Sequence, residues 1–327
     1  MKRINKTIFS LLLAALAGTQ SLAQTHNPAW GPDWPDPTVW MGEDGNYYSV
    51  ATGLRHLIKS PDLIHWEDTE GHVMDRETRR QMWSQYGRNF WAPDVTTVGG
   101  QRLLYITLYN SAEDSNIGVL KEDSPGHFSF HGIITRGQET GIDDTIDPEV
   151  VTDPETGIVW LYFGSVGGIH RVQLAADGLS LAPDAKYEHV AGLTVRQNPD
   201  RSRVFEGAYL HRHEGYWYLF VSSGHYGDHT YKLQVGRSKT LDGTFLNRKG
   251  KKMVEGYATP VLTSQKGDRF YGPGHCGEIF QRDGHEYMFY HCHDAQIGNP
   301  HHRPMLVQEI KWDKKGWPYF EGGKPQE

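Results

Sequence analysis

The stretch Val204-Phe-Glu-Gly-Ala-Tyr-Leu210 decides the fold of this chain. A carboxylate, Glu206, opens a short apolar strand, polar residues around Glu214-Gly215 form a turn, and an aromatic strand runs back from Tyr216 to Val221. Aromatic and β-branched residues at this density are typical of a strand packed between neighbouring sheets. The same sequence phrase occurs five times in the chain. Each copy has an opening residue, a short strand, a turn and a second short strand.

The other four copies begin with the sequences Asp36-Pro-Thr-Val, Ala92-Pro-Asp-Val, Asp147-Pro-Glu-Val and His275-Cys-Gly-Glu. Successive opening residues are 56, 55, 59 and 69 residues apart. A repeat of about 50 residues that is built from short strands is typical of β-propeller blades. We therefore predict an all-β fold, a five-bladed β-propeller in which each phrase supplies the first two strands of one blade.

The opening residues form one column, which reads Asp36, Ala92, Asp147, Glu206 and His275. In a propeller the first strand of each blade lines the central axis, so residues at one offset meet there although they are distant in sequence. Asp-Pro also begins turns. However, turn formation does not require an acid in the same column of three separate blades, so the column predicts a site.

Three carboxyl groups in one site permit the hydrolysis of a glycosidic bond. This reaction needs an acid that protonates the leaving oxygen and a base or nucleophile on the opposite face of the sugar. Two carboxyl groups with differently tuned pKa values can fill these roles, and closely spaced carboxylates raise one another's pKa. The alternative is a carbohydrate-binding propeller without catalysis, which the loss of any of the three acids would have favoured.

The ordered set of phrases resembles glycoside hydrolase family 43, and within it the arabinanase-type enzymes. The matching pieces are Asp36-Pro-Thr-Val, Trp91-Ala-Pro-Asp94, Ile146-Asp-Pro-Glu149, Glu206-Gly-Ala-Tyr209 and Gly272-Pro-Gly-His275. The resemblance implies a five-bladed propeller that inverts the anomeric centre. It assigns the general base to Asp36 and the general acid to Glu206, and it gives Asp147 the task of orienting that acid and tuning its pKa.

The expected substrate-binding residues are Trp91, Asp94, Trp34 and Phe205. By the resemblance, Trp91 forms a stacking wall beside the acids, because an aromatic face buries the apolar face of a sugar. Trp34 and its neighbour Trp30 could act in the same way or could serve as packing for the N-terminal segment.

The resemblance also bears on metal binding. His275 matches a histidine that in the family helps to hold an ion, often calcium, or water at the propeller centre, although calcium prefers oxygen ligands. The other histidines include the pairs His211/His213, His291/His293 and His301/His302 among 18 in the chain. No HExxH or CxxC motif is present, so these pairs are expected to be surface or strand residues rather than a zinc site.

The substrate predicted by the resemblance is plant cell-wall polysaccharide, with endo-1,5-α-L-arabinanase as the main expectation. One phrase departs from the commoner arabinanase form, because Cys276 follows His275 where Asn is usual. An exo-acting α-L-arabinofuranosidase or β-xylosidase of the same family therefore stays open as an alternative.

Residues 1–23 have the features of a secretory signal peptide. Lys2, Arg3 and Lys6 precede the apolar run Ile8 to Ala17, and small residues at Ser21 to Ala23 offer a cleavage site. Residues 24–327 are then expected to form one catalytic domain, a monomer exported to the periplasm or the medium. Without the three leader cations the formal charge changes from −7 to −10, which argues against nucleic acid as a partner, and no later stretch is apolar enough to cross a membrane.

The remaining expectations concern the outer parts of the blades. Residues 58–66, 168–174, 235–245 and 305–312 are expected to form outer strands, and residues 72–85 are the one candidate helix, a solvated insertion. Cys276 and Cys292 flank the turn of one hairpin. Export would permit a disulfide between them, and two buried free thiols are the alternative.

Overall fold

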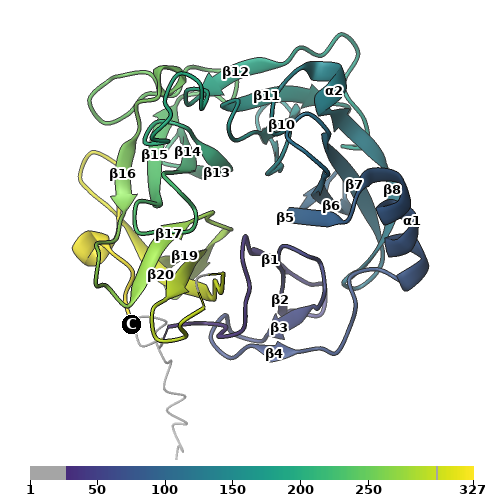
Figure 1. Ribbon diagram of the computed structural model, residues 1–327, viewed down its shortest axis with the longest axis horizontal. Helices are drawn as coiled ribbons and strands as arrows, with labels where there is room; N and C mark the ends of the chain where they lie inside the picture. The colour runs from purple at the N-terminus through teal and green to yellow at the C-terminus, as the bar shows by residue number, and fades with distance from the viewer. Residues whose placement is uncertain (1–26, 300) are drawn as a thin grey trace, which may run out of the picture.

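The computed structural model describes residues 27–299 and 301–327, so the predicted signal peptide lies outside the described residues. Five antiparallel sheets surround one axis, and the chain passes through them in order (Figure 1). The five-bladed β-propeller is therefore confirmed. Among the described residues, no helix has the length and apolar character needed to cross a membrane.

The strands of each blade follow in chain order. Blade one comprises β1 (Thr38–Met41), β2 (Tyr47–Val50), β3 (Ile58–Ser60) and β4 (Glu67–Asp68); blade two, β5 (Asn89–Val98), β6 (Gln101–Tyr109), β7 (Ser115–Ser124) and β8 (His127–Arg136); blade three, β9 (Glu149–Thr152), β10 (Val159–Phe163), β11 (Ile169–Leu174) and β12 (Glu188–Ala191). Blade four comprises β13 (Glu206–His213), β14 (Tyr216–Ser223), β15 (Lys232–Ser238) and β16 (Thr259–Leu262); blade five, β17 (Phe270–Gly274), β18 (Ile279–Arg282), β19 (His285–Asp294), β20 (Met305–Trp312) and β21 (Pro318–Tyr319).

Each repeated phrase forms the innermost hairpin of its blade. In blade four, Leu210 of β13 faces Leu219 of β14. Three of the predicted outer segments contain the third strands β3, β11 and β20, and the segment 235–245 overlaps the third strand β15, which begins three residues earlier. The hydrophobic core is divided into five clusters, each lying between two neighbouring blades. The aromatic second strands supply these clusters, and Tyr218 and Phe220, for example, are fully buried between blades four and five.

The N-terminal segment closes the propeller against blade five. Trp30 forms a β-bridge with Met305, and the side-chain amide of Asn27 donates to the carbonyl of Val307 and accepts from its N–H, each at 3.0 Å. Contacts between the beginning and the end of the chain therefore hold the first and last blades together.

Helical structure is confined to short insertions. Helix α1 (Arg76–Tyr86) begins after Asp75, whose carboxylate accepts from the N–H of Thr78 at 2.7 Å as an N-cap. This helix confirms the predicted one, although it starts four residues later, where the cap is. Helix α2 (Gly137–Thr140) and two 3₁₀ turns, η2 (Met253–Glu255) and η3 (Glu321–Gly323), are the other helical elements of the described residues.

Two rings of hydrogen bonds tie each blade to the one before it. In the first ring, a backbone N–H at the start of a blade donates to a side chain in or just after the second strand of the preceding blade. The pairs are Ala92 to Thr52 (2.8 Å), Asp147 to Thr107 (3.0 Å), His275 to Ser222 (2.8 Å) and Asp36 to His291 (3.0 Å). This ring fixes the opening residues of four blades around the axis.

The second ring lies deeper along the axis and includes all five blades. Its N–H donors and side-chain acceptors are Val95 and Thr38, Val150 and Asp94, Leu210 and Glu149, Ile279 and Tyr209, and Val39 and Glu278. Burial raises the pKa of Asp94 to about 7 and that of Glu278 to about 8. It also raises the pKa of Glu149 well above its ordinary value, with the charge of Asp94 adding to the effect.

Candidate active site

The opening residues of the blades share an unusual backbone conformation. Asp36, Ala92, Asp147 and His275 have φ values between 43° and 58°, in the left-handed region that few residues other than glycine adopt. In blade four the residue with this conformation is Gly207, at φ 57°, and not Glu206. The predicted column is therefore correct for blades one, two, three and five, and it is shifted by one residue in blade four.

The shift changes where Glu206 points. Glu206 faces Ser222 across its hairpin, just as Trp91 faces Thr107 in blade two, and a bulge follows both residues. Glu206 and Trp91 thus hold equivalent positions, one residue before the axial column. A Cβ atom on Gly207 would lie 2.9 Å from Nδ1 of His275, so glycine is required there both for its φ and for its close contact with the axis.

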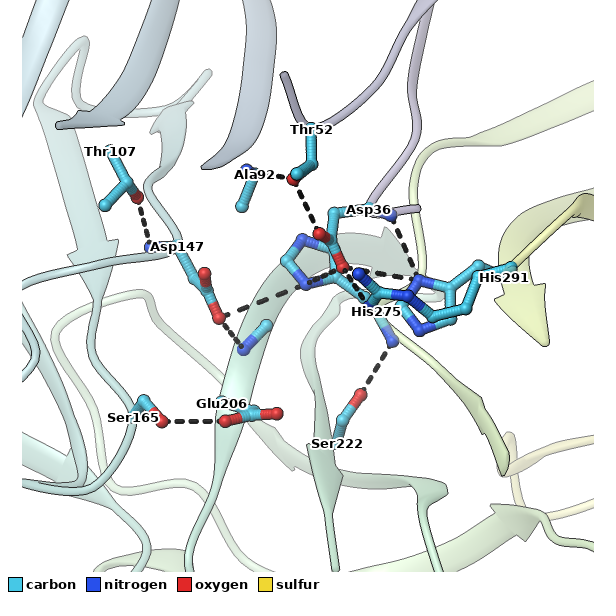
Figure 2. Close-up of polar contacts among 12 residues, drawn as sticks. Asp36, Thr52, Ala92, Thr107, Asp147, Ser165, Glu206, Ser222, His275 and His291 are labelled. Carbon is cyan, nitrogen blue, oxygen red and sulfur yellow. Dashed lines mark hydrogen bonds and ion pairs between the residues drawn. The ribbon is translucent and has the colours of Figure 1, made fainter. Parts of the chain in front are cut away.

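A cavity of about 300 Å³ collects the predicted functional residues at this end of the axis. It is lined by Asp36, Asp147, Glu206, Trp91 and His275, which the chain supplies from all five blades. Figure 2 shows the acids and the hydrogen bonds that hold them. The structure therefore brings together the three acids, the proposed stacking wall and the axial histidine.

Asp36 is held as a carboxylate. Its Oδ2 accepts from the hydroxyl of Thr52 at 2.6 Å, and its Oδ1 lies 3.4 Å from a guanidinium nitrogen of Arg303. Burial alone would raise the pKa of Asp36, but the charge of Arg303 and this hydrogen bond bring it well below its ordinary value. His275 and His291 also lie near Asp36, yet burial lowers the pKa of both histidines. They are neutral near pH 7, so Arg303 is the main counter-charge.

Glu206 is oriented by two hydroxyl groups. The phenol of Tyr231 donates to Oε1 and the hydroxyl of Ser165 donates to Oε2, each at 2.7 Å. Tyr231 directly precedes β15, and Ser165 follows the second strand of blade three. Both carboxyl oxygens therefore have fixed neighbours, which limits the side chain to one orientation toward the cavity.

The pKa of Asp147 is affected by both of the other acids. Burial, followed by the charges of Glu206 and Asp36, raises its pKa well above the ordinary value. Its Oδ2 accepts from the N–H of Gly207 at 3.1 Å and lies 3.9 Å from Nδ1 of His275. Asp36 and Asp147 thus have opposite pKa shifts, an arrangement that suits a site with one base and one shared proton.

Several residues of the cavity were not foreseen from the sequence. The lining includes Asp144, Arg201, Tyr226, Tyr231 and Arg303. Burial and the neighbouring charge of Glu206 raise the pKa of Asp144 to about 6, and its Oδ1 is buried with no hydrogen-bond partner among the described residues. The one signal in the sequence was the acidic pair Asp143-Asp144 just before Asp147.

Three residues expected to bind substrate have other positions. Phe205 is fully buried in the core between blades three and four, and Asp94 accepts from Val150 in the second ring. Neither residue lines the cavity, so their predicted contact with sugar is wrong. Alternate residues of a strand point in opposite directions, and Phe205 points into the core. Trp34 is buried, and its indole N–H donates to Ser49 at 2.9 Å; it lines a neighbouring hollow.

Cys276 and Cys292, both within the described part of the chain, are buried free thiols. Of the two alternatives left open for them, the structure has the unpaired one. Both belong to the core between blades four and five, and burial raises the pKa of each thiol well above its ordinary value. They act as small apolar residues in that core.

A five-bladed propeller that gathers three carboxyl groups in one cavity, with the pKa of Asp36 lowered and that of Asp147 raised, is the arrangement of a glycoside hydrolase. The chain belongs to the glycosyl hydrolases family 43, whose family model matches residues 25–318.

Individual relatives agree with this assignment. The chain is 30% identical to an extracellular endo-α-(1→5)-L-arabinanase of Bacillus subtilis, with 95% of this chain and 96% of that protein aligned. It is 27% identical to an extracellular exo-α-(1→5)-L-arabinofuranosidase of Cellvibrio japonicus, over 95% of this chain and 90% of that protein. Among solved structures, the α-L-arabinanase of Cellvibrio cellulosa complexed with arabinohexaose matches with a TM-score of 0.75 and 25% identity, covering 88% of this chain and 95% of that one.

Proposed function

We propose that this protein is an inverting endo-1,5-α-L-arabinanase that hydrolyses the α-1,5-linked backbone of arabinan. The observation that carries the proposal is a pair of carboxyl groups in one cavity, an ionised Asp36 beside Arg303 and a Glu206 fixed by two hydroxyls. The arabinanases among the relatives supply the substrate class.

In the proposed reaction, Asp36 takes a proton from a water molecule, and the water oxygen forms a bond to the anomeric carbon. At the same time Glu206 donates its proton to the glycosidic oxygen, and the bond between that oxygen and the anomeric carbon breaks. Attack from the opposite face inverts the configuration and requires the two carboxyl groups to be roughly 6.5–9.5 Å apart. Asp147 assists in two ways. It accepts a hydrogen bond from the peptide N–H that follows Glu206, and it shares negative charge with Glu206.

The shape of the surface favours a polymer as substrate. A second hollow of about 790 Å³ adjoins the catalytic cavity, and Thr52, Trp91 and Arg303 line both. Trp30, Trp34 and Trp83 line this second hollow as well. A chain of several sugar units can extend from the acids into the hollow, with Trp91 at the junction, and stack on aromatic faces along it.

The experiment that tests the proposal is product sizing on linear arabinan, debranched arabinan and xylan. An endo-acting enzyme releases a range of oligosaccharides early and lowers the viscosity of linear arabinan quickly. An exo-acting α-L-arabinofuranosidase, which the Cellvibrio japonicus relative makes the second candidate, releases one small product from the beginning with little change in viscosity. Hydrolysis of xylan alone would indicate the β-xylosidase alternative.

We propose that a calcium ion at the axis is held by His275 together with water. Three carboxyl groups nearby favour a cation, but His275 offers a single nitrogen and its Nδ1 already faces Asp36 at 3.4 Å and Asp147 at 3.9 Å. The fit is therefore that of a weak site, since calcium takes six to eight oxygen ligands. Bound there, the ion would add positive charge beside the acids. Metal analysis after gel filtration, with and without a chelator, tests for it, and His275→Gln is the variant to compare.

We propose that the protein is exported and acts as a monomer. The apolar leader at residues 1–23 supports export, and so does the description of both relatives as extracellular. N-terminal sequencing of protein from the culture medium and periplasm would locate a cleavage site, and light scattering would give the oligomeric state.

A further inference from the structure

A second group of ligand-type side chains lies at the far end of blade four. His211 and His213 alternate with the exposed Arg212 at the end of β13, so both imidazoles leave the strand on the same face. That face packs against blade five, where Glu286 is the second residue of β19. One nitrogen of each histidine and a carboxylate oxygen of Glu286 all lie within 4.8 Å of one another.

The separations are close to those of a metal site. Nε2 of His211 is 3.8 Å from Oε1 of Glu286, and Nδ1 of His213 is 3.9 Å from Oε2. Both distances are too long for hydrogen bonds. Ligands about 2.1 Å from a tetrahedral ion lie about 3.4 Å apart, so side-chain shifts of at most about 1.4 Å would bring three ligand atoms that lie within 4.8 Å of one another to that spacing.

One ligand atom lacks any other partner. Nε2 of His211 is buried and has no hydrogen-bond partner in the described chain, and the three side chains are only 16%, 19% and 21% exposed. A buried imidazole nitrogen without a partner is costly, and a cation would satisfy it.

Trp312 of β20 holds the group in place. Its indole lies parallel to the ring of His213, with 3.7 Å between centroids and 6° between planes, and stacks on His211 at 5.9 Å and 19°. Its N–H donates to Oε2 of Glu286. Hydrogen bonds of this kind orient metal-binding carboxylates, and here the bond leaves Oε1 for an ion.

We propose that His211, His213 and Glu286 form a binding site for a divalent transition-metal ion of the zinc type. Two imidazoles and one carboxylate suit zinc, cobalt, nickel or copper better than calcium, which prefers oxygen. The site is distinct from the axial one: β13 runs from Glu206 to His213, which places it about 20 Å from the catalytic acid. An ion there would link the first strand of blade four to the second strand of blade five, and the three protein ligands leave a position for water.

The test uses the whole mature chain, freed of metal with a chelator and dialysed against zinc or cobalt. One equivalent of bound metal is expected, together with a rise in the thermal midpoint and, for cobalt, the visible absorption of a tetrahedral ion. Copper should quench the fluorescence of Trp312 because the indole stacks on a ligand, and most of that quenching should be lost in Trp312→Phe.

The variants His211→Gln, His213→Gln and Glu286→Gln should each lower the metal affinity at least tenfold and remove the thermal shift. Two controls should bind metal as the unmodified chain does: His285→Gln, an exposed histidine beside Glu286, and the double change His301→Gln/His302→Gln. Unchanged hydrolysis of arabinan in every variant would show that the fold persists. Sub-stoichiometric binding at micromolar metal, or full binding by both His211→Gln and His213→Gln, would overturn the proposal.

Discussion

The carboxylate of Asp147 accepts a hydrogen bond from the N–H of Gly207, the residue after Glu206, at 3.1 Å. A side chain of blade three thus holds the peptide that carries the proposed general acid of blade four. Burial and the charge of Glu206 raise the pKa of Asp147, so the protonation of Asp147 depends on the acid whose backbone it holds.

Replacing Asp147 with Asn should keep this hydrogen bond, since the amide oxygen can accept it, and remove a negative charge beside Glu206. We expect kcat/KM to fall by about tenfold to a hundredfold, less than loss of the acid itself. The upper limb of the pH profile should move to lower pH, because the remaining acid loses its proton more easily. An upper limb that stays in place, measured by kcat/KM between pH 4 and 9, would show that Asp147 is only structural.

The roles of Glu206 and Asp36 can be separated by the leaving group. Glu206→Gln should lower kcat/KM on arabinan by about 10²–10⁴-fold, and an activated aryl glycoside should recover much of the loss because its leaving group needs little protonation. Asp36→Asn removes the activation of water, so the aryl glycoside should not rescue it. Rescue of Asp36→Asn and not of Glu206→Gln would reverse the two assignments.

Arg303 should control the acid limb of the pH profile. Its guanidinium lies 3.4 Å from Asp36 and keeps the pKa of this carboxyl low. In Arg303→Gln the pKa of Asp36 should rise, so activity on the acid side is lost at a pH about one unit higher. Arg303→Lys, which keeps the charge, is the control and should move the limb less. If the acid limbs of all three proteins coincide, Arg303 does not control the pKa of Asp36.

Trp91 stacks on Tyr109 with centroids 4.1 Å apart and lines both the catalytic cavity and the adjoining hollow. Trp91→Ala should raise KM for arabinan by about tenfold through the loss of sugar stacking, and Trp91→Phe should recover part of it. If Trp91→Ala leaves KM and kcat within twofold, the side chain serves packing alone.

The second ring makes the stability of the fold depend on pH. Glu278 has a pKa of about 8 in the folded protein and about 4.3 when unfolded, so the folded state binds more protons between these values. The free energy of unfolding should therefore fall as pH rises from about 5 to 8, by an amount on the order of a few kcal/mol.

Glu278→Gln cannot ionise and should flatten this dependence, while its amide can still meet Val39 and Thr38. Urea unfolding at several pH values measures the effect. Glu77→Gln, on the exposed face of α1, is the matched control and should behave as the unmodified chain does. Parallel curves for Glu278→Gln and Glu77→Gln would contradict the assignment of the dependence to the axis.

The repeated phrases predicted the blades and the axial residues because both depend on a fixed offset in sequence. They placed Glu206 one residue out of register, since matching acid with acid overlooked that Gly207 supplies the left-handed backbone of blade four. Arg303 and Tyr231 could not be found in this way. They reach the cavity from the loops that precede the third strands β15 and β20, so no repeat connects them to the acids. The pairing of Glu286 with two histidines was hidden for the same reason.

Ala92 has the same backbone conformation and the same N–H bond to the preceding blade as Asp36 and Asp147, yet its side chain is a methyl group. Holding a residue in this column therefore depends on the backbone and not on the chemistry of the side chain. In blades one, two, three and five a single codon change can add or remove a functional group without altering the neighbouring strands, whereas blade four is fixed by its glycine. Duplicated blades of this kind give evolution, and enzyme engineers, four separately adjustable positions around one substrate, of which blade two still has its position open.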